Sequence, residues 1–91
     1  MSLKGISVKK MARDIGEGYI LITAASLKKY QPQDLKQLLT VLSIVQREIR
    51  TTSVPDDDFD AVKKRNWRLQ NISRSMMIIN GFIKHRRIKI D

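Results

Sequence analysis

The sequence predicts an all-α protein, an up-down-up bundle of three helices. Apolar residues recur three, four or seven positions apart in three long segments, as on one face of a helix. Pro32 and Pro55 separate these segments, and proline interrupts helices. The connections are short, which makes successive helices antiparallel neighbours. At 91 residues, the chain is expected to form one helical domain over residues 1–91.

The first helix is expected over residues 7–30, although Gly16 and Gly18 lie inside it. Each glycine costs about 1 kcal/mol relative to alanine in a helix interior. The apolar stripe nevertheless keeps its phase across both glycines, whereas a break usually resets it. A continuous or gently kinked helix is therefore favoured over a break. The stripe consists of Val8, Met11, Ala12, Ile15, Tyr19, Ile22, Ser26 and Tyr30.

The second helix is expected over residues 33–50. Pro32 suits a first turn, and Asp34 suits the positive end of a helix dipole. The stripe is unbroken and comprises Leu35, Leu38, Leu42, Val45 and Ile49. Residues 51–55 are β-branched or hydroxylated and end in proline, which indicates a loop.

The third helix is expected over residues 56–80, after Pro55 and a group of aspartates that suit a helix start. Asn80-Gly81 suits a helix C-terminus. Residues 82–91 form a basic C-terminal arm, which fits either a further helical turn or an extended segment. The helical stripe comprises Phe59, Val62, Leu69, Ile72, Met76, Ile79 and Ile83.

Composition narrows the function classes. The chain has no cysteine and one histidine, His85, and shows no catalytic or metal-ligand spacing. We therefore expect a protein that is not an enzyme and that holds no metal or cofactor. The longest apolar runs are too short for a transmembrane segment. A soluble, cytoplasmic protein is expected.

The net charge of +9 favours polyanionic partners. In a three-helix bundle, the first connection and the end of the third helix meet at one pole, where most charges are basic. This pole and the arm are the predicted site for nucleic acid or an acidic partner. Its residues are Lys28, Lys29, Lys36, Lys84, Arg86, Arg87 and Lys89. Trp67, among cations, suits either base stacking or packing on another helix, and the packing is favoured.

The first and third helices are expected to be apolar on nearly all sides over part of their length. A helix of this kind needs cover on every side, and exposed apolar patches usually mark association surfaces. A homodimer through helices one and three is therefore predicted, with a monomer covered by its own arm as the alternative. The same surface would serve a helical adaptor that binds another protein. The predicted surface comprises Tyr19, Ile20, Met76, Met77 and Ile78.

Overall fold

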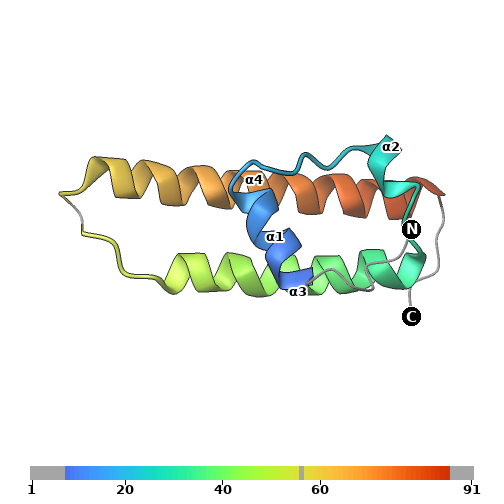
Figure 1. Ribbon diagram of the computed structural model, residues 1–91, viewed down its shortest axis with the longest axis horizontal. Coiled ribbons are helices and arrows are strands. Elements are labelled where there is room, and N and C mark those ends of the chain that lie inside the picture. Colours follow the sequence, from blue (N-terminus) through green and yellow to red (C-terminus); the bar gives the residue numbers. More distant parts are fainter. Residues whose placement is uncertain (1–7, 56, 87–91) are drawn as a thin grey trace.

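The computed structural model describes residues 8–55 and 57–86. These residues form four helices and no strand: α1 (Val8–Gly16), α2 (Ala24–Leu27), α3 (Pro32–Thr51) and α4 (Phe59–Arg86). The two longest, α3 and α4, run side by side in opposite directions, and α1 lies across them near their middle (Figure 1). The predicted all-helical class is confirmed for this part of the chain, and its three longest helices pack together.

The core lies where α1 meets the α3–α4 hairpin. The stripe of α3 supplies Leu35, Leu38, Leu42 and Val45, all buried, as the heptad-like spacing predicts. From α4 come Ile72 and Ile79, which have no exposed surface. The remaining buried apolar residues are Met11, Ala12, Ile15, Ile22 and Leu27.

The expected continuous helix over residues 7–30 is wrong, because α1 ends at Gly16. Gly18 has φ of +81°, a left-handed conformation that stops a helix and that glycine adopts without strain. A Cβ at Gly18 would lie 3.0 Å from the Trp67 ring, and one at Gly16 would lie 3.2 Å from Ile72. Both glycines thus permit close approach of α4. The up-down-up bundle is therefore not built from three full-length helices.

Two polar contacts hold the turn at residues 16–18 against α4. The Asn71 side-chain amide donates to the Gly16 carbonyl oxygen at 2.9 Å, and the Arg68 guanidinium pairs with Glu17. Beyond the turn the chain extends along α4 to α2 (Figure 1). Ile20 and Ile22 pack on the core there, whereas Tyr19 and Leu21 face outward. This alternation is that of an extended chain.

The third predicted helix is longer than expected at its C-terminus. Asn80-Gly81 does not cap α4, which continues to Arg86. The first six residues beyond the expected end, 81–86, are thus helical rather than an extended arm, and residues 87–91 lie outside the described residues. At the other end, α4 begins at Phe59 instead of residue 56. Asp58 caps it, since its carboxylate accepts from the Ala61 N–H at 3.0 Å.

Candidate nucleic-acid interface

Basic residues of α3, of α4 and of the turn that follows α2 meet at one end of the α3–α4 hairpin. We call this the basic end and define it by Lys28, Lys29, Lys36 and Lys84. Helix α2 packs on α4, and the start of α3 lies beside the last turns of α4 because the two helices are antiparallel (Figure 1). All four lysines are exposed. The predicted residues Arg87 and Lys89 lie outside the described residues.

The short helix α2 positions Lys28 and Lys29. Its start carries a reciprocal capping box: the Thr23 hydroxyl accepts from the Ser26 N–H at 3.1 Å, and the Ser26 hydroxyl oxygen accepts from the Thr23 N–H at 3.0 Å. The Leu27 side chain is completely buried and fastens α2 to the core. Because Lys28 follows Leu27 directly, this anchor determines where the lysine pair begins.

At the start of α3, Asp34 contributes to local structure. Its carboxylate accepts from the Gln31 N–H at 3.2 Å and is almost fully buried, so it serves the first turn of the helix. Lys36, two residues further on, is exposed. Asp34 is the only acidic residue among the described residues of these connections, so the exposed charges of the basic end are all positive.

The last turns of α4 complete this end. A hollow of about 370 Å³ lies between α2 and α4, with Ala24, Ala25 and Lys28 on one side and Phe82 and His85 on the other. Lys28 and His85 are therefore neighbours across it. Lys84 is exposed on the same turn as His85. Arg86 is the last residue of α4.

A basic and aromatic face extends from the basic end along α4. Its exposed residues are spaced three, four or seven apart, which puts them on one side of the helix. They are Lys63, Trp67, Arg74, Met77 and Lys84. The Trp67 ring packs on the turn at Gly18 instead of on another helix, and the residue is still 45% exposed.

The predicted association surface is only partly exposed. Tyr19 is 79% exposed and Met77 is 73% exposed. Ile20, Met76 and Ile78 pack against the core instead: Ile20 faces inward from the extended chain, and Met76 and Ile78 are partly buried on α4. Leu21, which lies in the expected apolar zone but was not among the predicted surface residues, is 72% exposed and lines a hollow with Ile78 and Arg74. The sequence held no signal for this difference, because residues 19–22 are all apolar.

The described residues contain neither a cluster of metal-ligating side chains nor a membrane-spanning helix. Within residues 8–55 and 57–86, no three metal-ligating side chains of the usual types gather. None of the helices in the described part of the chain combines the length and the apolar character needed to cross a membrane. Comparison with protein-family models, curated proteins and solved structures found no match.

Proposed function

We propose that this protein is a small, non-enzymatic nucleic-acid-binding factor that contacts phosphates through the basic end. The observation that carries the proposal is the grouping of Lys28, Lys29, Lys36 and Lys84, all exposed, at one end where Asp34 is buried in a helix start. Lysines near phosphates release condensed counterions, which drives binding without base specificity.

The face of α4 that adjoins the basic end suits a single strand. From Trp67 to Lys84 the helix rises about 25 Å, at about 1.5 Å per residue. A strand along this face would meet Arg74 between the two and could stack a base on the exposed part of the Trp67 ring. We therefore expect single-stranded nucleic acid to bind at least as well as duplex of equal charge.

The experiment is a fluorescence-anisotropy titration of labelled single-stranded and duplex oligonucleotides over a range of salt concentrations. If four lysines each neutralise one phosphate of a duplex, log K falls with log salt with a slope of about −3.6. Raising salt from about 50 to about 200 mM should then weaken binding roughly 150-fold. Absence of binding at the lower salt would reject the proposal.

A second candidate is association with protein, either a second copy or another helical partner. The observation that favours it is the exposure of Tyr19, Leu21 and Met77. Large exposed apolar side chains often belong to association surfaces. A homodimer would scatter light as twice the 10.5 kDa of one chain.

The two candidates respond to different substitutions. Leu21→Glu should abolish association and leave the exposed lysines in place, whereas Ile20→Glu would disturb the core and is unsuitable. Light scattering at micromolar concentration measures the first effect, and oligonucleotide binding serves as the control. A wild-type mass of one chain at all concentrations would reject the homodimer.

A further inference from the structure

We propose that a cavity between the end of α3 and the first half of α4 binds a small aliphatic monocarboxylate. The cavity is about 200 Å³ and lies at the opposite end of the hairpin from the basic end, near the loop that joins α3 to α4 (Figure 1). It is separate from the surfaces proposed above for nucleic acid and for protein, so the inference does not depend on either.

The apolar part of the lining comes from three elements. Ile49 lies on the last turns of α3, Val54 on the loop and Ala61 on the first turn of α4, and all three are partly buried. Apolar lining favours a ligand with a hydrocarbon portion, since its burial removes apolar surface from water.

The polar part of the lining is cationic. Arg65, Lys64 and Arg68 line the same cavity. The Arg68 guanidinium already pairs with Glu17, so its charge is partly balanced. The Nε atom of Arg65 is buried and meets no hydrogen-bond acceptor among the described residues. A buried donor without an acceptor is unfavourable, and a planar guanidinium matches a carboxylate.

A carboxylate in the cavity would provide that acceptor. The Arg65 side chain is only partly buried, so rotation about its own torsions can bring the guanidinium to a ligand. Lys64, which is exposed at the rim, adds a second positive charge. A ligand that fits the cavity therefore combines one anionic group with a short apolar body.

The cavity's surroundings limit the charge of the ligand. An adjoining hollow shares Ile49, Thr52 and Arg68 with the cavity, and Glu17 and Glu48 line it. Arg13 also lines this hollow, so its two arginines and two glutamates sum to zero charge and give a second negative charge no net attraction in that direction. A monocarboxylate is accordingly favoured over a dicarboxylate or a phosphate ester.

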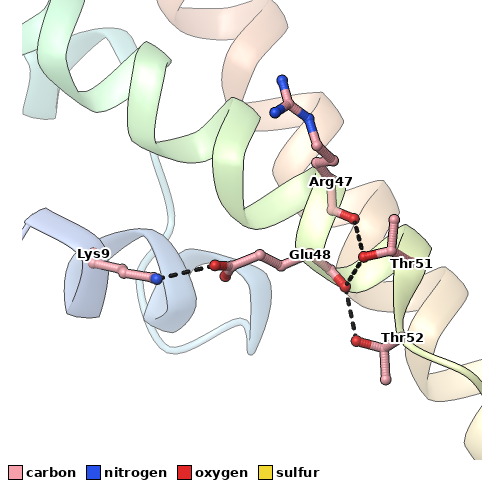
Figure 2. A network of polar contacts seen from close by, with 5 residues as sticks. All are labelled: Lys9, Arg47, Glu48, Thr51 and Thr52. Atoms are coloured by element: carbon pink, nitrogen blue, oxygen red, sulfur yellow. Dashed lines mark hydrogen bonds and ion pairs between the residues drawn. The ribbon is translucent and has the colours of Figure 1, made fainter.

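The wall formed by α3 is well ordered by hydrogen bonds. The Thr52 hydroxyl donates to the Glu48 carbonyl oxygen at 2.7 Å, and the Thr51 hydroxyl donates to the carbonyl oxygens of Arg47 and Glu48 at 3.0 and 3.1 Å. Figure 2 shows this network, with Lys9 of α1 paired to the Glu48 carboxylate at 3.0 Å. A helix end held in this way preforms the site and lowers the cost of binding.

Cavity size selects the probe. At about 30 Å³ for a water-sized group, the cavity holds roughly seven non-hydrogen atoms. 3-Methylbutanoate has that size, and 3-methylbutanamide is its neutral counterpart of nearly the same shape. For a ligand this small we expect a dissociation constant of about 1 mM.

The test is a titration of the full chain, labelled with ¹⁵N, followed by NMR. Addition of 3-methylbutanoate should give saturable shifts at Ile49, Ala61 and the Arg65 Nε–H signal, and the amide should give none or at least 10-fold weaker binding. The Nε–H signal reports directly on the proposed contact and needs no variant. Shifts that do not saturate, or equal binding of acid and amide, would overturn the proposal.

Two variants separate this site from general attraction of anions by a basic protein. Arg65→Met keeps the apolar stem and should weaken binding at least 10-fold. Arg74→Met, the same change on an exposed position of α4, should leave the dissociation constant unchanged within twofold. Equal weakening by both variants would contradict the proposal. If Arg65→Met does not fold, Arg65→Lys replaces it, and it should also weaken binding because lysine lacks the planar fork.

Discussion

The two ends of the α3–α4 hairpin carry charge in different ways. At the basic end, Lys28, Lys36 and Lys84 are exposed, and Asp34 is buried in the first turn of α3. At the opposite end, exposed Asp57, Asp58 and Asp60 lie close in sequence to exposed Arg50, Lys63 and Lys64. When opposite charges lie within about 10 Å of one another, their electric fields largely cancel further away from the protein.

This difference shows that a net charge of +9 is not spread evenly over the surface. The lysines of the basic end come from α3, α4 and the turn after α2, and they depend on tertiary packing for their proximity. The charges at the opposite end are neighbours along the chain and need no packing to mix. Disturbing the packing of α2 should therefore affect the basic end alone.

The largest effect is expected for Leu27→Ala, which removes the buried anchor of α2. Loss of a fully buried leucine should lower the free energy of unfolding by about 2 to 4 kcal/mol, measured by urea denaturation. It should also weaken oligonucleotide binding, because Lys28 and Lys29 lose their fixed place. Leu21→Ala is the matched control, and as an exposed leucine it should cost within about 0.5 kcal/mol. Equal effects would contradict the proposed anchor.

An intermediate effect is expected for Gly18→Ala, which acts on the turn that directs the chain toward α2. Alanine would be strained at φ of +81°, and its Cβ would meet the Trp67 ring at 3.0 Å. We expect a loss of about 2 kcal/mol in the free energy of unfolding.

Gly81→Ala should change the free energy of unfolding in the direction opposite to that of Gly18→Ala. Gly81 is helical, and nothing lies within 4 Å of an added Cβ. Alanine should therefore stabilise the protein by up to about 1 kcal/mol. A result in which both glycine variants destabilise equally would show that the turn at Gly18 is not special.

The smallest effect is expected for Thr23→Ala, which removes one half of the capping box of α2. A lost N-cap costs about 1 kcal/mol. Because α2 carries Lys28 and Lys29 to the basic end, oligonucleotide affinity should fall slightly as well. Thr40→Ala, on the exposed face of α3, is the control for hydroxyl loss without capping. Hydrogen exchange at Leu27 would detect local fraying that urea denaturation averages out.

Sequence reasoning located α3 and most of α4 because their buried residues follow one stripe, from Leu35 to Val45 and from Ile72 to Ile79. It failed between Gly16 and Thr23 for a physical reason. Ile15 and Ile22 are seven residues apart and both buried, so a helix and a turn followed by an extended segment satisfy the same pattern. The deciding contacts, from Trp67 and Asn71 to the glycine turn, are tertiary.

The basic end was foreseeable despite that failure. After Gly18 the chain still runs along α4 in the direction that the continuous helix would have taken, so Lys28 and Lys29 reach the same end (Figure 1). The sequence contains no comparable signal for the carboxylate cavity. Ile49, Val54 and Arg65 carry no recognisable spacing, and only the fold of the connecting loop brings them together.

The most direct test of the account compares two triple variants of equal net charge. Lys28→Gln, Lys36→Gln and Lys84→Gln neutralise the basic end, and Arg47→Gln, Arg50→Gln and Lys64→Gln neutralise the same number of cations at the opposite end. Each variant has a net charge of 9 minus 3, or +6. The account predicts that the first variant loses about 2.7 from the magnitude of the salt slope of duplex binding, and the second almost nothing. Equal losses would show that binding follows overall charge and would contradict an interface at the basic end.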